Sequence, residues 1–288
     1  MSLQENAGER IDAHHHLWRY DEAEFGWIDD TMNLLRRDFL APDLTPLLQV
    51  SGVTGTIAVQ ARQTIEETHW LLTTARQFPW IRGVVGWLPI SDVRFEDHLD
   101  LLTAEPMLKG LRHIVQAEPP GFLDDPGFNR GIRQLTRCGL TYDLLIFSKQ
   151  LEEALRFVRR HPQQSFVIDH IAKPNMEAVG FAFWSRLIRE FADLSNVTCK
   201  ISGMVTETRG TPWNPEFLKP YFDVVLETFG PSRLMTGTDW PVLTMRCGYR
   251  QWWQTVEEWI APLSAFERSN ILGETALRVY HTIPAQVL

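Results

Sequence analysis

Three histidines near the amino end carry the clearest chemical signal in this sequence. They lie in residues 10–18, Arg-Ile-Asp-Ala-His-His-His-Leu-Trp, directly after a short apolar run. Side chains alternate between the two faces of a β-strand, so Asp12, His14 and His16 are predicted to share one face and His15 the other. Two neutral imidazoles on a rigid strand can bind a divalent metal such as zinc, which makes bound water a nucleophile near neutral pH. The alternative is a solvated histidine run or the remnant of an affinity tag.

A carboxylate near the other end of the chain could complete such a site. The run Gly-Thr-Asp-Trp-Pro covers residues 237–241 and follows an apolar segment. Asp239 could bind a metal, take a proton from its water and return that proton to a leaving oxygen. The structural alternative is an N-cap for a following helix, which is disfavoured because Pro241 comes directly after Trp240.

A third candidate is the run Asp-His-Ile-Ala-Lys-Pro, residues 169–174. His170 could bind a metal or donate a hydrogen bond to a substrate carbonyl, and Lys173 is a candidate substrate ligand. A single histidine at the end of a strand is often only a structural residue. Its combination with the two other candidate positions favours a functional role.

Further polar side chains end other apolar segments. Arg112 and Lys200 are cations on strands that read as buried, and buried cations are costly unless they are paired or stabilise developing negative charge. The alternative for Arg112 is an ion pair with Asp12 or Asp143. His113 is a candidate for stabilising an oxyanion. The remaining candidates for substrate contacts are Gln60, Tyr142, Trp27 and Trp240.

Eight apolar, β-branched runs bounded by turn residues predict eight strands, and segments with helical spacing lie between them. The predicted strands are residues 10–16, 54–61, 81–89, 108–115, 140–147, 165–172, 197–203 and 233–239. Apolar strands that alternate with helices indicate a parallel sheet covered by helices, and eight units in about 280 residues fit a closed (β/α)8 TIM-type barrel. An open doubly wound sheet is the competitor, but no Gly-x-Gly-x-x-Gly follows the first strand.

The candidate residues fall at the carboxyl ends of these strands, where barrel enzymes place their active sites. Three long connections, residues 17–42, 204–213 and 240–253, are expected to form the walls of a pocket. The first connection contains Trp18 and Trp27. We therefore expect a cleft lined partly by aromatic rings.

The composition limits the classes of partner. The formal net charge is −8 and the sequence has no Lys/Arg block, which argues against a nucleic-acid partner. No apolar run reaches the roughly 20 residues of a membrane span, and no secretory signal is evident, so we expect a cytoplasmic protein. Residues 1–9 read as a disordered or added tail and residues 10–288 as one domain. The cysteines predict neither a disulfide framework nor a sulfur-ligated zinc site, because they are three in number and far apart: Cys138, Cys199 and Cys247.

The chain resembles the amidohydrolase superfamily. The resemblance rests on four motifs in the expected order: His-x-His on the first strand, Asp-His-x-x-Lys-Pro on the sixth, Lys-x-Ser-Gly on the seventh and Gly-x-Asp-Trp-Pro on the eighth. More narrowly, it is similar to the branch with sugar lactonases, including L-fuconolactonase and L-rhamnonolactonase, and dicarboxylic pyrone lactonases. The resemblance implies that His14 and His16 are the first-strand pair, His170 the sixth-strand histidine and Asp239 the acid/base.

One departure from the superfamily pattern bears on the metal. Many members have a bridging lysine or carboxylate on strand four and a ligating histidine on strand five, whereas strand five here has no histidine and strand four has Lys109 only at its beginning. We therefore expect one zinc or none. The resemblance implies hydrolysis of a sugar-acid lactone, with L-fuconolactone and related aldonolactones as first choices. The alternatives are a metal-dependent decarboxylase, a dicarboxylate pyrone lactonase and a ligand-binding barrel without chemistry.

Overall fold

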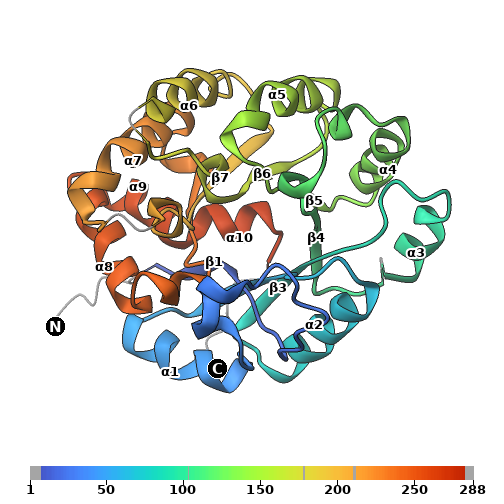
Figure 1. The fold of residues 1–288 in the computed structure, drawn as a ribbon, viewed down its shortest axis with the longest axis horizontal. Helices are drawn as coiled ribbons and strands as arrows, with labels where there is room; N and C mark the ends of the chain where they lie inside the picture. Colours follow the sequence, from blue (N-terminus) through green and yellow to red (C-terminus); the bar gives the residue numbers. More distant parts are fainter. Residues whose placement is uncertain (1–7, 103, 178, 210–211, 283–288) are drawn as a thin grey trace, which may run out of the picture.

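Eight parallel strands follow one another in sequence order around a barrel, as the sequence predicts (Figure 1). The computed structural model describes residues 8–102, 104–177, 179–209 and 212–282. The expected tail at residues 1–9 therefore lies largely outside the described residues. The strands are β1 (Ile11–His15), β2 (Gly55–Val59), β3 (Ile81–Gly86), β4 (Leu108–His113), β5 (Thr141–Leu144), β6 (Phe166–Ile168), β7 (Val197–Ile201) and β8 (Leu234–Thr236).

Helices form a ring around the strands (Figure 1). The α-helices of the described residues are α1 (Ala41–Ser51), α2 (Ile65–Gln77), α3 (Phe95–Leu102), α4 (Pro126–Arg137), α5 (Leu151–Arg160), α6 (Gly180–Arg189), α7 (Pro215–Phe229), α8 (Tyr249–Ile260), α9 (Ala265–Ser269) and α10 (Thr275–Val279). Of these, α10 does not belong to the ring. The prediction of one long eighth connection, residues 240–253, is wrong in its last part, because α8 begins at Tyr249. This helix buries Trp252 and Trp253, which the sequence analysis had placed in or beside a loop.

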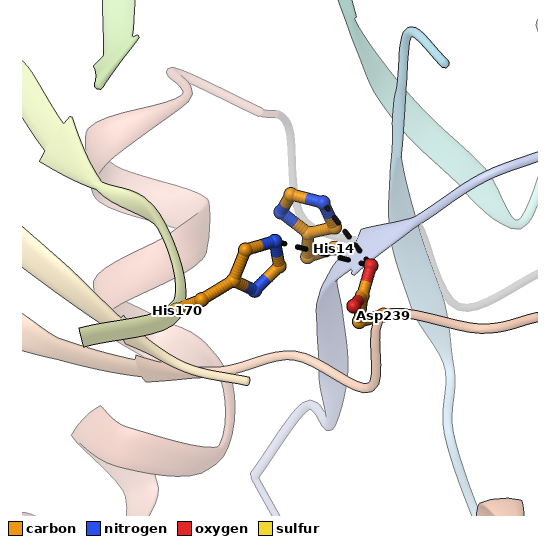
Figure 2. A group of neighbouring side chains, drawn as sticks. All are labelled: His14, His170 and Asp239. Atoms are coloured by element: carbon orange, nitrogen blue, oxygen red, sulfur yellow. Dashed lines mark ion pairs between the residues drawn. The ribbon is translucent and has the colours of Figure 1, made fainter. Parts of the chain in front are cut away.

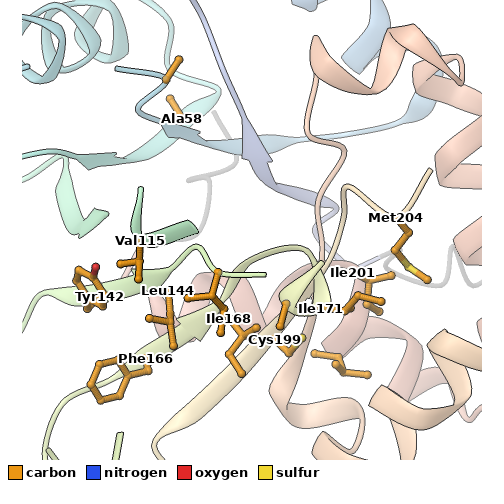
Figure 3. Packing of buried hydrophobic residues seen from close by; sticks show 14 of the residues in the cluster. Ala58, Val115, Tyr142, Leu144, Phe166, Ile168, Ile171, Cys199, Ile201 and Met204 are labelled. Atoms are coloured by element: carbon orange, nitrogen blue, oxygen red, sulfur yellow. The ribbon is translucent and has the colours of Figure 1, made fainter. Parts of the chain in front are cut away.

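The core has two layers. Between the strands and the outer helices lies a large apolar layer, part of which is shown in Figure 3. Inside the barrel lies a smaller cluster that includes Ile57, Val85 and Met235 from the strands and Leu277 and Tyr280 from the region of α10. The short helix α10 is seen across the middle of the ring in Figure 1. These apolar side chains fill the barrel on the side of α10. The predicted functional residues lie at the opposite side, where the strands end.

The first and last parts of the sheet meet at the predicted functional residues. The amide of Asp239 donates to the carbonyl of His14 at 2.8 Å, and the amide of His16 donates to the carbonyl of Trp240 at 2.6 Å. An isolated parallel bridge joins His15 to Trp240. The contacts that bring the two ends of the sheet together therefore also place Asp239 beside the two histidines.

No helix in the described part of the chain is long and apolar enough to cross a membrane. The three cysteines are free, with Cys138 exposed and Cys199 and Cys247 buried.

Candidate active site

Three histidines surround the carboxylate of Asp239 at the end of the barrel where the strands finish. Oδ1 of Asp239 lies 3.2 Å from Nε2 of His16, 3.8 Å from Nε2 of His14 and 3.9 Å from Nε2 of His170. Figure 2 shows His14 and His170 pointing toward Asp239 from different segments of the chain. All four side chains are buried, and the site is assembled from His14 on β1, from His16 directly after it, and from the segments that follow β6 and β8.

The histidines of β1 reach this point through an irregular register. The pairing of β1 with β2 shifts between Asp12 and His15. The expectation that Asp12 shares a face with His14 and His16 is therefore wrong. The Asp12 carboxylate instead accepts hydrogen bonds from the hydroxyl groups of Thr238, at 2.6 Å, and Tyr249, at 2.9 Å.

The other ring nitrogen of each histidine faces a polar partner. Nδ1 of His16 donates to the carbonyl of Val59 at 2.8 Å. Nδ1 of His170 lies 2.8 Å from Oγ of Ser202, and Nδ1 of His14 lies 3.3 Å from Oδ1 of Asp169. This is how metal-binding histidines are usually oriented, because a partner that takes the Nδ1 hydrogen leaves the Nε2 lone pair free.

The donor set fits a divalent metal ion. One ligand atom each from His14, His170 and Asp239 can be chosen so that all lie within 4.8 Å of one another. Nε2 of His16 adds a nitrogen 3.3 Å from Nε2 of His14. Imidazole nitrogens with one carboxylate oxygen are ligands that zinc accepts.

The electrostatics of the site keep these groups in the forms that bind a metal. Burial lowers the pKa of His170 to about 4 and holds that of His14 well below its ordinary value, so both rings are neutral near pH 7. Burial acts to raise the pKa of Asp239, but the neighbouring His170 and His16 outweigh it and keep that pKa below its usual value. The carboxylate is therefore charged at neutral pH and can act as a base.

A buried group of charged residues lies next to His14. Nζ of Lys200 lies 2.5 Å from Oδ2 of Asp143, 3.0 Å from Oδ1 of Asp169 and 3.1 Å from Nδ1 of His14. Nη1 of Arg112 donates to Oδ2 of Asp169 at 2.9 Å. Two cations thus balance two carboxylates, which is the condition for holding charges in the interior.

This arrangement settles the alternative considered for Arg112 and shows what Gln60 and Lys200 contact. Arg112 pairs with Asp169, and neither Asp12 nor Asp143 is its ion-pair partner. Gln60 is fully buried, and its side-chain and main-chain oxygens accept hydrogen bonds from Nη2 of Arg112. Lys200 is likewise fully buried within the charged group. In this structure, Gln60 and Lys200 support the site without facing its opening.

A pocket of about 200 Å³ opens above these residues. Lys173 contributes an ammonium group whose nearest carboxylate oxygen, Oε1 of Glu207, is 3.9 Å away. Trp27, from the long first connection, is 38% exposed and lines the same pocket. The pocket is lined by His16, Trp27, Ala61, Arg112, Ile114, Gln116, Ala117, Leu145, His170, Lys173, Asp239 and Val242.

Six of the twelve candidate residues do not line this pocket: His14, Gln60, Lys200, His113, Tyr142 and Trp240. The contacts of the first three are given above, and the other three lie elsewhere. His113 lies in a separate surface pocket, where it accepts a hydrogen bond from Nε1 of Trp87 and bonds to Glu118. Tyr142 is fully buried and packs against Phe128 of α4, on the helix side of β5. The ring of Trp240 is buried against Phe39. We therefore leave these three out of the set that we propose to contact substrate.

Two acidic residues and one serine behind the site, Asp143, Asp169 and Ser202, were not among the predicted site residues. Asp143 alternates with Tyr142 on β5 and is paired in register with Arg112, so a charged residue on a buried strand was the available signal. Asp169 directly precedes His170, and Ser202 lies in the Lys-x-Ser-Gly motif. Each of these positions was visible as a polar residue in an apolar run, but the sequence did not show which barrel face it occupied.

Comparisons with known proteins identify the family of this chain. The sequence profile of the amidohydrolase family matches residues 11–282. An L-fucono-1,5-lactonase of Burkholderia multivorans is 38% identical over 283 residues, covering 94% of this chain and 95% of that protein. A second L-fucono-1,5-lactonase, from Burkholderia ambifaria, is 36% identical over 236 residues, covering 81% of this chain and 80% of that protein.

A solved structure of a related amidohydrolase has the same fold. A crystal structure of an amidohydrolase from Burkholderia multivorans with bound zinc superposes with a TM-score of 0.91 at 38% identity, covering 96% of this chain and all of that one. The eight-stranded barrel and the histidine–aspartate site thus occur in a chain whose sequence matches one family profile over most of its length. This protein belongs to the amidohydrolase family.

Proposed function

We propose that this protein hydrolyses sugar-acid lactones and that L-fucono-1,5-lactone is its leading substrate. The observation that carries the proposal is the charged carboxylate of Asp239 at the base of the pocket, surrounded by three imidazoles. The similarity to two named L-fucono-1,5-lactonases supports the choice of substrate.

We further propose a single zinc ion at this site. His14, His170 and Asp239 would hold it, with His16 as a further nitrogen ligand. A bound zinc ion polarises a carbonyl oxygen and lowers the pKa of water. The bound zinc in the related Burkholderia multivorans structure supports this choice of metal.

Asp239 acts first as the general base and then as the general acid in this reaction. Its carboxylate takes a proton from a water molecule, and the water oxygen forms a bond to the lactone carbonyl carbon. When the tetrahedral intermediate collapses, the bond from this carbon to the ring oxygen breaks. The protonated Asp239 then gives its proton to the ring oxygen, which becomes a hydroxyl group. A lactone is an activated ester, so one carboxylate with modest electrostatic help suffices.

The negative charge that develops on the carbonyl oxygen needs donors on the pocket wall. We assign this role to Lys173, because this residue lines the pocket and, among the described residues, the carboxylate oxygen nearest to its Nζ is Oε1 of Glu207 at 3.9 Å. The guanidinium group of Arg112 also lines the pocket, but Asp169 and Gln60 already accept its hydrogen bonds. A pocket with one loosely paired cation suits a neutral polyol better than a dicarboxylate.

The rest of the pocket suits a sugar ring. Trp27 offers an aromatic face at the opening, while Ile114, Leu145 and Val242 form an aliphatic wall. Gln116 adds an amide group for a sugar hydroxyl. Such a mixture of apolar surface and a few polar groups is usual for small-molecule sites.

A pH-indicator assay on a panel of lactones tests the proposal. The panel contains L-fucono-1,5-lactone, other aldonolactones and 2-pyrone-4,6-dicarboxylate, with a parallel assay for CO2 release from aromatic acids. We expect acid release to be fastest with L-fucono-1,5-lactone and its close analogues, and we expect no CO2. Turnover confined to the pyrone, or release of CO2, would reject the proposed substrate class.

A further inference from the structure

The turn that carries His170 has an unusual backbone. Its four successive residues His170, Ile171, Ala172 and Lys173 have φ angles of 52°, 49°, 60° and 40°. None of them is glycine, and residues with side chains rarely adopt this left-handed conformation, β-branched isoleucine least of all. Such a segment persists only where its surroundings hold it, and it is often found at functional sites.

This backbone places two pocket residues. His170 begins the turn and Lys173 ends it, and both side chains line the pocket. Between them, Ile171 and Ala172 are fully buried and belong to the apolar layer between strands and helices, where Figure 3 labels Ile171. A return of the turn to the right-handed region would change the directions of both side chains that line the pocket.

A side chain from outside the barrel holds this turn. Nε1 of Trp184, on α6, donates to the carbonyl oxygen of Ile171 at 2.7 Å. Trp184 is fully buried, and its ring lies 5.3 Å from that of Tyr221 on α7 and 6.0 Å from that of Phe181. It does not line the pocket, so it acts on the site only through the turn. Loss of its N–H would leave a buried carbonyl group without this donor.

We propose that Trp184 is a positioning residue, which fixes the imidazole of His170 opposite Asp239 by holding the left-handed turn. The effect on turnover rests on the proposed lactonase function, whereas the effect on the position of His170 does not. Trp184 does not line the pocket and so does not contact the reacting atoms. Its contribution is to the direction in which Nε2 of His170 points.

The test compares two tryptophan-to-phenylalanine variants. Trp184→Phe keeps most of the ring and removes the donor. Trp259→Phe is the matched control, because Trp259 is 5% exposed on α8 and its Nε1 has no hydrogen-bond partner within the described residues. For Trp184→Phe we expect kcat to fall about 10- to 100-fold with KM within about threefold, and Co²⁺ affinity, followed by visible absorption, to weaken by at least about tenfold. The control should keep both values.

A second variant separates positioning from general destabilisation. Glycine adopts the left-handed region without a steric penalty, so Trp184→Phe/Ala172→Gly should recover much of the lost kcat and Co²⁺ affinity. Equal kcat and Co²⁺ affinity in Trp184→Phe and Trp259→Phe, or no recovery in the double variant, would overturn the proposal.

A crystal structure of Trp184→Phe decides the matter even if lactones prove not to be substrates. A displaced His170 ring or a changed φ at Ile171 supports the positioning role. An unmoved ring and an unchanged turn refute it, whatever the assay shows about the proposed function.

Discussion

The amide nitrogen of Asp239 lies 2.8 Å from the carbonyl oxygen of His14, although the two residues are near opposite ends of the chain. This main-chain hydrogen bond joins the end of β8 to β1. Nε2 of His14 also lies 3.8 Å from Oδ1 of Asp239. The contact that closes the sheet therefore also brings two residues of the candidate active site together.

Replacement of Asp239 should remove turnover. Asp239→Asn keeps the size of the side chain but cannot accept the proton from water, so kcat should fall by about 10²- to 10⁴-fold. Steady-state kinetics on the best lactone measures this, and circular dichroism checks the fold. Asp223→Asn on α7, where an exposed carboxylate pairs with Lys219, is the control and should retain full activity. Near-normal turnover by Asp239→Asn would remove Asp239 from the mechanism.

Removal of metal should lower both activity and thermal stability. A chelator followed by dialysis takes away an ion that binds only the folded state, and a ligand present at 100 times its Kd contributes about 2.7 kcal/mol to the free energy of unfolding. We expect the melting temperature of the dialysed protein to fall and to recover on addition of zinc. His14→Gln, which removes one ligand, should show no such recovery. Identical melting curves with and without chelator would contradict the proposed zinc site.

Trp27 should affect binding more than chemistry. Trp27→Ala removes a partly exposed aromatic ring from the pocket wall. This ring comes from the first connection and takes no part in the proton transfer that we assign to Asp239. We expect KM for the lactone to rise about tenfold while kcat changes by less than about threefold, because the lost contact serves substrate and transition state alike. A large fall in kcat at unchanged KM would show instead that Trp27 shapes the catalytic groups.

The buried ion pairs should matter for stability. Lys200→Met leaves Asp143 and Asp169 without their shared cation, and breaking a buried pair by removing one partner costs about 3–5 kcal/mol. Urea denaturation measures this loss, and Lys200→Met/Asp143→Asn should recover part of it because one uncompensated charge is gone. Lys219→Met breaks an exposed pair on α7 and should cost less than about 1 kcal/mol. Similar losses at the two lysines would mean that the buried network is not needed for folding.

His161 should make the protein less stable at acid pH. Burial, together with Arg133 and Arg160, lowers the pKa of His161 to about 4, and its ring contacts Asn129 at 2.8 Å. Between about pH 4 and the ordinary value of 6.5, the unfolded chain therefore binds more protons at this position than the folded one. The contribution of His161 to the free energy of unfolding should thus rise with pH across that window and be lost as pH falls.

The comparison of wild type with His161→Gln isolates this effect from that of other titrating groups. The difference between the two urea midpoints should grow from pH 4.5 to pH 7. A difference that is constant with pH would assign the acid sensitivity to other residues.

The chain's apolar runs were sufficient to predict the barrel, and four motifs were sufficient to predict His14, His16, His170 and Asp239 as neighbours. Parallel strands of one barrel end on the same side, so polar residues that follow the strands meet there whatever their separation in sequence. The sequence could not show which face a residue occupies when the register is irregular. That is why Asp12 was expected among the histidines. The choice of Tyr142 over Asp143 had another cause, because the pairing of β5 is regular but alternation alone does not show which face of a strand points into the barrel.

The sequence by itself thus determined the fold class, the order of the strands and the types of side chain available for chemistry, because these follow from local periodicity and composition. Only the tertiary structure decided how the charges pair, as in Arg112 with Asp169 and Lys200 with Asp143, and which ring nitrogen of each histidine faces Asp239. These depend on distances of about 3 Å between segments far apart in the chain, and such distances are fixed only when the sheet closes.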